Sequence, residues 1–173
     1  MTARFGWAAM ALAGCSALAA AGHPTNAPQL IWNTTASAPE GLYALRPGGG
    51  AGVGDWVAAA PPPKLAAWLD ARGYLPAGAL LIKQVAATAP SLACRDRGSI
   101  SIDGRARARA VAADRRGRAL PSWRGCRRLA GGEVFVLNPA EGSLDSRYFG
   151  PLPSSAIRGR LVPLLLWERR HEA

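Results

Sequence analysis

The sequence is poor in the residues that most catalytic and metal sites use. It has two histidines, of which His23 borders an apolar run and His171 lies in the C-terminal tail. Neither position suits a catalytic triad with a histidine base. The three cysteines lack zinc-ligand spacing, and the glycine-rich segment 46–54 lacks the GKS/T ending of a phosphate-binding loop. We therefore expect no metal and no cofactor.

Lysine is also scarce, because only Lys64 and Lys83 are lysines among the 21 Lys and Arg residues. Lys83 stands in the stretch ALLIKQV, where five of its six neighbours are apolar. Arginine stays protonated in proteins, whereas a desolvated lysine loses its proton near neutral pH and acts as a general base. Two interpretations remain open from this stretch alone: a general base, or an edge-strand lysine whose ammonium group reaches water.

Aromatic residues make up only 7% of the chain, although its net charge is +10. The arginines concentrate between Arg95 and Arg128, where few aromatic side chains are available to stack on bases. We therefore expect no nucleic-acid partner. A solvated basic loop, or a surface near anionic lipid, explains this charge more simply. The length of 173 residues suits one domain with its own core.

The N-terminus carries one long apolar run, from Phe5 to Gly22, after the single basic residue Arg4. This pattern predicts a secretory signal or signal anchor over residues 1–22, with the N-terminus in the cytoplasm. The sequence LAGC, ending at Cys15, resembles a lipoprotein cleavage box, but the chain stays apolar beyond it. Whether the segment is retained, cleaved or lipidated therefore stays open.

The expected anchor fixes the expected compartment of the rest of the chain. We predict a bacterial inner-membrane protein with a single N-terminal span, a connector at 23–32 and a periplasmic catalytic domain at 33–173. Cys94 and Cys126 then face an oxidising compartment, so a disulfide between them is expected. It would close a loop worth roughly 3 to 4 kcal/mol in the loop-entropy model. Two unrelated buried thiols are the alternative.

The hydrophobic pattern beyond the connector predicts a mainly β domain with one short helix. The helix is expected within PPPKLAAWLDARGY at 61–74, where prolines lead in and Gly73 ends it. An Asp-Gly turn inside 99–113 predicts a hairpin. The segments 132–138 and 157–167 read as strands, and the segment 143–153 between them as a proline-bounded turn.

Several short motifs follow one another in a familiar order: NTTASAPEGLYAL, GDWV, LLIKQV, IDG, GEVFVL and SLDSRYFGP. Together they resemble the signal peptidase I superfamily, and most closely its conjugative-transfer branch, the TraF-type peptidases that mature pilin subunits. The resemblance runs from Asn33 to Trp167 and includes the N-terminal run. It implies a signal-peptidase-like catalytic domain built from curved antiparallel sheets.

The same resemblance assigns the two residues of a catalytic dyad. The serine of SAPEGLY marks Ser37 as the nucleophile, and the lysine that heads the next β-run marks Lys83 as the general base. Such a dyad needs a neutral lysine to take the hydroxyl proton. Thr35 matches a hydroxyl position that helps the backbone N–H of Ser37 to bind the oxyanion.

The motif SLDSR matches the last conserved box of the family and supplies supporting residues. Ser143 is expected to donate a hydrogen bond that orients the lysine amine. Asp145, Ser146 and Arg147 are expected to support the site, and Asp145 is also the acidic position that the TraF-type branch needs. Taken without the resemblance, Asp145 and Arg147 would read as an ordinary turn ion pair.

Two departures from the housekeeping signal peptidases favour the specialised branch. Ala38 replaces the usual methionine after the serine, and QVAATAP replaces a segment that carries glycine and aspartate. The resemblance implies a membrane-inserted preprotein or pilin substrate with small residues near the cleavage site, in contact with the lipid bilayer. Water or the substrate's own amino terminus would resolve the acyl-enzyme, giving hydrolysis or cyclisation.

Two hypotheses from other classes remain open from the sequence. In the first, the chain is a catalytically idle periplasmic or lipoprotein component of a type IV secretion apparatus. In the second, it is a basic domain that binds nucleic acid or anionic lipid through the 95–128 segment. The unusual placement of Lys83 speaks against the idle component. Binding that vanishes in modest salt and survives loss of Ser37 would favour the basic domain.

Overall fold

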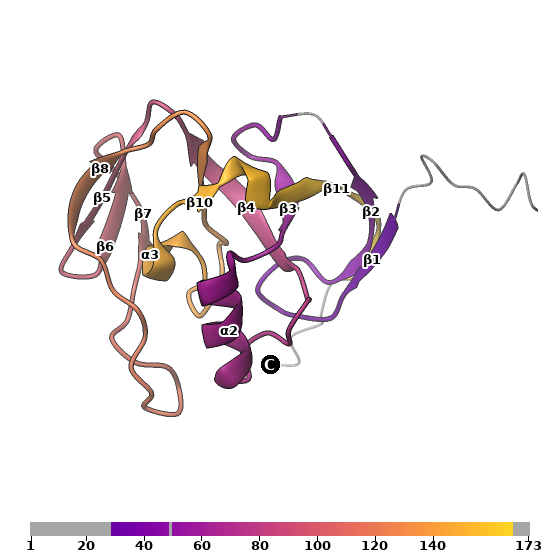
Figure 1. Cartoon of the computed structure of the whole chain (residues 1–173), viewed down its shortest axis with the longest axis horizontal. Coiled ribbons are helices and arrows are strands. Elements are labelled where there is room, and N and C mark those ends of the chain that lie inside the picture. Colours follow the sequence, from indigo (N-terminus) through magenta and orange to yellow (C-terminus); the bar gives the residue numbers. More distant parts are fainter. Residues whose placement is uncertain (1–28, 49, 168–173) are drawn as a thin grey trace, which may run out of the picture.

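The computed structural model describes residues 29–48 and 50–167, which form two antiparallel sheets (Figure 1). The larger sheet has seven strands, in the spatial order β1 (Gln29–Asn33), β2 (Gly41–Arg46), β11 (Ile157–Leu166), β3 (Trp56–Ala59), β4 (Leu81–Thr88), β9 (Glu133–Val136) and β10 (Leu152–Pro153). The mainly β class with curved antiparallel sheets, expected from the sequence, is confirmed. The predicted anchor at 1–22 lies outside the described residues.

Four strands form the second sheet, in the order β7 (Arg105–Arg109), β6 (Ser99–Ile102), β5 (Leu92–Asp96) and β8 (Gly125–Arg128). It lies at the end of the molecule opposite β1 and β2 (Figure 1). Asp103 and Gly104 join β6 to β7 with φ values of 49° and 78°, and Ile102 pairs with Arg105. Positive φ at both turn residues suits a two-residue hairpin, so the predicted hairpin is confirmed.

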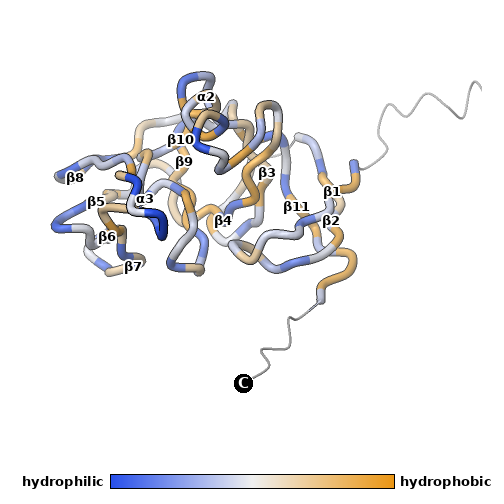
Figure 2. Tube along the Cα trace, turned by 90° about the horizontal axis from the view of Figure 1, so that it is seen from below, coloured by the Kyte–Doolittle hydropathy of each residue, from blue (hydrophilic) through white to orange (hydrophobic). Residues whose placement is uncertain are grey.

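The expectation of a solvated loop for the arginine-rich segment is wrong, because residues 95–128 contribute to all four strands of the small sheet. Inward-facing residues such as Ala93, Ile100 and Ile102 bury one face of this sheet, which an arginine count does not reveal. The segment holds eleven arginines and three aspartates, so it carries +8 of the net charge of +10. Figure 2 shows hydrophilic stretches in β6, β7 and β8.

Helix α2 (Pro63–Ala71) confirms the predicted helix. Proline occupies its first turn, where a missing N–H costs nothing, and Gly73 follows its end with a φ of 66°. Leu69 is its fully buried residue and packs in the core cluster formed by β3, β4 and β9. Over the described residues, no helix is long and apolar enough to cross a bilayer.

The predicted turn at 143–153 also contains secondary structure. Helix α3 (Ser146–Phe149) starts where the Asp145 side chain accepts a hydrogen bond from the Arg147 N–H, and η1 (Ser154–Ala156) follows β10. A helix this short cannot show a 3.6-residue hydrophobic period, so the prediction of a single helix is wrong. Strand β1 likewise begins at Gln29, inside the predicted connector.

A disulfide joins Cys94 of β5 to Cys126 of β8, the pair that the sequence analysis favours. The two residues lie directly opposite each other in the strand register, with a Cα–Cα distance of 4.0 Å. The bond therefore links neighbouring strands of the small sheet and encloses strands β6 and β7 in its loop.

We expect the purified protein to show no reactive thiol at Cys94 or Cys126 until a reductant is added, because a disulfide sulfur is not a thiolate nucleophile. Alkylation followed by mass spectrometry, with and without reductant, measures this directly. Modification of both residues in the unreduced protein would contradict the bridge.

Candidate active site

Lys83 lies in the middle of the larger sheet, where β4 pairs with β3 on one side and β9 on the other. The residue is only 4% exposed, so the edge-strand interpretation is wrong. The Lys83 Nζ donates a hydrogen bond to the Ser143 Oγ at 2.8 Å. Ser143 is therefore the acceptor and not the predicted donor, because an ammonium group has only donors. Burial lowers the pKa of Lys83 from 10.5 to about 8, with Asp145 opposing this shift and Arg147 adding to it.

Ser37 lies in the loop between β1 and β2, and the side chain of Asn33 holds that loop in shape. The Asn33 Nδ2 donates to the carbonyls of Thr35, Ala38 and Pro39, at 3.1, 3.2 and 2.9 Å. The Asn33 Oδ1 accepts from the N–H and the hydroxyl of Thr35, at 3.0 and 2.7 Å. The Thr35 Oγ1 lies 3.3 Å from the Ser37 Oγ, so the two hydroxyls share one edge of the loop.

Asp145 and Arg147 form a bidentate ion pair that is 0% and 1% exposed. The Arg147 Nε and Nη2 donate to the two Asp145 carboxylate oxygens at 2.8 and 3.0 Å. Arg147 also donates to the Glu141 carbonyl at 3.0 Å. The Ser146 Oγ accepts from the Val136 N–H at 2.9 Å. The pair is therefore a core feature that fixes the segment around Ser143, rather than an ordinary turn ion pair.

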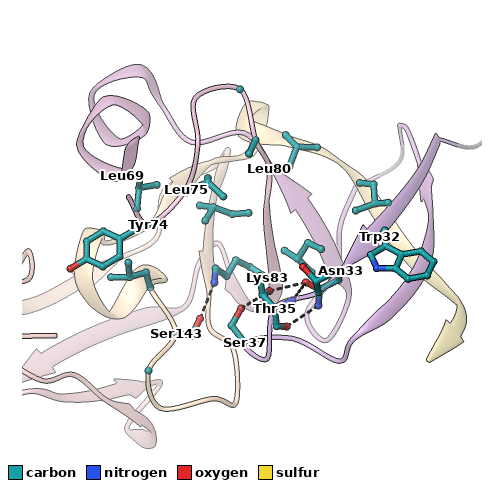
Figure 3. Close-up of a pocket in the computed structure, with 18 of the residues that line it drawn as sticks. Trp32, Asn33, Thr35, Ser37, Leu69, Tyr74, Leu75, Leu80, Lys83 and Ser143 are labelled. Carbon is teal, nitrogen blue, oxygen red and sulfur yellow. Dashed lines mark hydrogen bonds between the residues drawn. The ribbon is translucent and has the colours of Figure 1, made fainter. Parts of the chain in front are cut away.

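Ser37, Lys83 and Ser143 line one cavity of about 650 Å³, together with Thr35. Figure 3 shows the Lys83 amine pointing into this cavity, towards Ser143 and beside the loop of Ser37. Most of the remaining wall is apolar and comes from β1, β4 and the region of α2, namely Leu30, Ile31, Trp32, Leu69, Leu75, Leu80, Leu81 and Ile82. The arrangement places the Ser37 hydroxyl and the Lys83 amine, whose pKa is lowered, in the wall of one largely apolar cavity.

Of the sequence-predicted residues, Asp145, Ser146 and Arg147 lie outside the lining of this cavity. They are buried in the protein interior behind Ser143, so their contribution to the site is indirect. Over the described ranges, no three His, Cys, Asp or Glu side chains form a group that could hold a metal ion.

Two further residues of the site region, Asn33 and Asn138, are not predicted from the sequence, and each is only 3% exposed. Each stands at the end of a β-run, one in QLIWN and the other in GEVFVLN. Asparagine after a strand usually marks a turn, and nothing in the spacing distinguishes these two. A buried amide at the end of two strands of one sheet is visible only once the strands are placed.

The fold and the cavity describe a peptidase-like domain. The family described as "Signal peptidase, peptidase S26" matches residues 3–167, nearly the whole chain. The chain therefore belongs to the signal peptidase S26 family.

Two similar proteins extend this result. Plasmid transfer protein TraF of Escherichia coli is 31% identical over 185 residues, covering 92% of this chain and 95% of that protein. The probable conjugal transfer protein TraF of Sinorhizobium fredii is 36% identical over 153 residues, covering 78% and 76%. A crystal structure of a signal peptidase I from Enterococcus faecalis V583 is 16% identical, with a TM-score of 0.38 over 64% of this chain and 96% of that one. The resemblance to the family and to its TraF-type branch is confirmed.

Proposed function

We propose that this protein is a membrane-anchored serine endopeptidase with a Ser37/Lys83 dyad, which matures a pilin-type preprotein during conjugative transfer. The observation that carries the proposal is the buried Lys83, whose pKa falls to about 8 in the cavity that Ser37 also lines. An amine with that pKa is partly neutral near physiological pH, as a general base must be. Burying a lysine amine costs free energy of folding, so its burial in this cavity argues against a catalytically idle protein.

In the proposed reaction the Ser37 Oγ attacks the scissile carbonyl carbon while its proton passes to the neutral Nζ of Lys83. The Ser37 N–H would stabilise the oxyanion, a contribution of about 3 to 4 kcal/mol per donor in serine peptidases. The Thr35 hydroxyl would add a second donor by exchanging its hydrogen bond to the Asn33 Oδ1 for one to the oxyanion. The Lys83 ammonium then protonates the departing amine, and the acyl group stays on Ser37. Water, or the amino terminus of the fragment that is acylated on Ser37, attacks the ester and releases Ser37, which gives hydrolysis or cyclisation.

Ser143 is the orienting group in this scheme, because it accepts the hydrogen bond of the Lys83 amine. The Asp145–Arg147 pair holds the segment that carries Ser143, and the Asp145 charge offsets part of the desolvation of the lysine. These residues set the state of the base without touching substrate.

The proposed substrate is a membrane-inserted preprotein with small residues near the cleavage site. The names of the TraF relatives support a role in conjugal transfer. Support for a position at the bilayer comes from exposed apolar side chains on β1 and β11, next to the cavity: Leu30 and Trp32 are each 61% exposed, and Leu164, Leu165 and Leu166 are 46 to 59% exposed. We propose an inner-membrane location with the catalytic domain in the periplasm.

A pH-rate profile tests the base. On a peptide that carries Ala-x-Ala before the cleavage site, kcat/KM is expected to rise with pH along a limb centred near 8, the pKa of Lys83 in the free enzyme. A limb absent between about pH 6 and 9 would show that another group is the base.

The pH dependence of the free energy of unfolding measures the pKa of Lys83 independently of catalysis. The folded lysine has the lower pKa, so between about 8 and 10.5 the unfolded chain binds more protons and the free energy of unfolding rises with pH. Below pH 8 both states are protonated, and this group adds no slope. Lys83→Met is expected to lose the alkaline rise, as measured by denaturant unfolding over that range. An unchanged rise in the variant would contradict the assignment.

A further inference from the structure

Asn138 is a buried side chain that connects the two halves of the proposed dyad. Its Nδ2 donates to the carbonyl of Ser37 at 2.7 Å and to the carbonyl of Ile82 at 3.1 Å. Its Oδ1 accepts from the Gln84 N–H at 3.0 Å. Ile82 and Gln84 flank Lys83, so one amide binds the strand of the base on both sides and also binds the residue of the nucleophile.

The main chain of Asn138 is fixed by the buried ion pair. Its N–H donates to the Asp145 Oδ2 at 3.0 Å, and its carbonyl accepts from the Arg147 Nη2 at 2.7 Å. The Asn138 side-chain amide therefore projects from a main chain that is fixed on both sides, and it joins the Ser37 loop to β4. Among the described residues no buried side-chain nitrogen or oxygen lacks a partner, so this network is complete.

Asn33 differs from Asn138 in the reach of its hydrogen bonds. Asn33 bonds within its own loop, to residues two to six positions away. Asn138 bonds across separations of 101, 56 and 54 residues. Asn33 therefore shapes the loop of Ser37, whereas Asn138 attaches that loop to β4.

We propose that Asn138 is a positioning residue that sets the separation between the Ser37 hydroxyl and the Lys83 amine, an inference that rests on the proposed function. Proton transfer requires the two groups within hydrogen-bond reach, and a displacement of about 1 Å costs on the order of 10²-fold in rate. The amide suits this task because both partner groups of its Nδ2 are carbonyls and its Oδ1 meets an N–H. An aspartate at this position keeps the acceptor and loses both donors.

The first test compares Asn138→Ala and Asn138→Asp in the full-length, membrane-embedded protein on the Ala-x-Ala peptide. Each is expected to lower kcat about 10²-fold, with KM changed less than about threefold, because the apolar substrate wall is intact. Gln84→Ala is the matched control. It removes an amide next to Lys83 that bonds to the Gly54 carbonyl instead of the Ser37 loop, and it should retain kcat within about twofold. If Asn138→Asp does not fold, because it buries a carboxylate against two carbonyl oxygens, the uncharged Asn138→Ala carries the comparison.

The second test probes the separation between residue 37 and the Lys83 amine without measuring catalysis. In a Cys15→Ala background, the thiol introduced by Ser37→Cys is expected to have a pKa below the usual value of about 8.5, because the Lys83 ammonium stabilises the thiolate. Adding Asn138→Ala should move this pKa back towards 8.5, as measured by the pH dependence of alkylation. Adding Gln84→Ala should not.

The outcomes separate the two proposals. Activity that survives in Ser37→Ala would overturn the proposed function. Inactive Ser37→Ala together with unchanged kcat in both Asn138 variants would overturn the positioning role alone. A thiol pKa that does not respond to Asn138→Ala would also overturn it. A fall in melting temperature with kcat preserved at low temperature would reduce Asn138 to a structural residue.

Discussion

Ser37→Ala and Lys83→Arg are each expected to abolish maturation of the preprotein, with kcat/KM reduced by about 10⁴-fold or more. Ser37→Ala removes the hydroxyl oxygen that forms the acyl-enzyme in the proposed mechanism. Lys83→Arg keeps the positive charge but supplies no neutral base, because guanidinium does not deprotonate in proteins. The measurement is the conversion of precursor to mature product, by mass spectrometry, with the protein in its membrane.

The chain offers a matched control in its other lysine. Lys64 is exposed on α2 and lies outside the cavity lining, so Lys64→Arg makes the same chemical change without touching the site. It should process the precursor at the normal rate. Normal maturation by Lys83→Arg would refute the dyad, and equal loss in Lys64→Arg would show that the assay responds to lysine content rather than to the base.

The buried ion pair is expected to dominate the stability of the region behind the site. Arg147→Met leaves the Asp145 carboxylate without its main partner in a fully buried position, which costs about 3 to 5 kcal/mol. Activity should fall in parallel, since the same change releases the Asn138 carbonyl and the segment of Ser143. Denaturant unfolding at pH 7 measures the free energy, and peptide cleavage measures the activity.

A surface pair provides the control for this prediction. Arg160 and Asp55 approach to 3.8 Å with half-exposed side chains, so Arg160→Met is expected to cost less than about 1 kcal/mol. The double variant Asp145→Leu with Arg147→Met should lose less stability than the sum of the single variants, because no unpaired charge remains. Additive losses, or equal losses at the two pairs, would contradict a special role for burial.

Local sequence features correctly predicted helix α2 and the turn between β6 and β7. The prolines before Lys64 and the glycine at 73 bound α2 in the sequence and in the structure, because both residue types act through backbone geometry alone. The Asp103–Gly104 turn is predictable for the same reason. The apolar neighbours of Lys83 place it correctly in a β-strand, although they do not decide whether that strand lies at an edge of the sheet.

Non-local pairing explains what the sequence could not show. The choice between an edge lysine and a buried one depends on β4 having β3 and β9 on its two sides, and those strands are distant in the chain. Asn138 contacts Ser37 across 101 residues, and nothing in the sequence around either residue indicates this contact. The arginine-rich segment reads as a loop because its inward face is made of a few small or aliphatic residues.

The disulfide links the two parts of the chain that contribute residues to the proposed site. Ser37 and Lys83 precede Cys94, whereas Ser143 follows Cys126, and the arginines at 115 and 116 lie exposed between the two cysteines. After a tryptic cut at these arginines, the disulfide would keep the fragment that carries Ser37 and Lys83 joined to the fragment that carries Ser143. Such a nicked protein should run at full mass on a non-reducing gel and separate into two fragments once the Cys94–Cys126 bond is reduced.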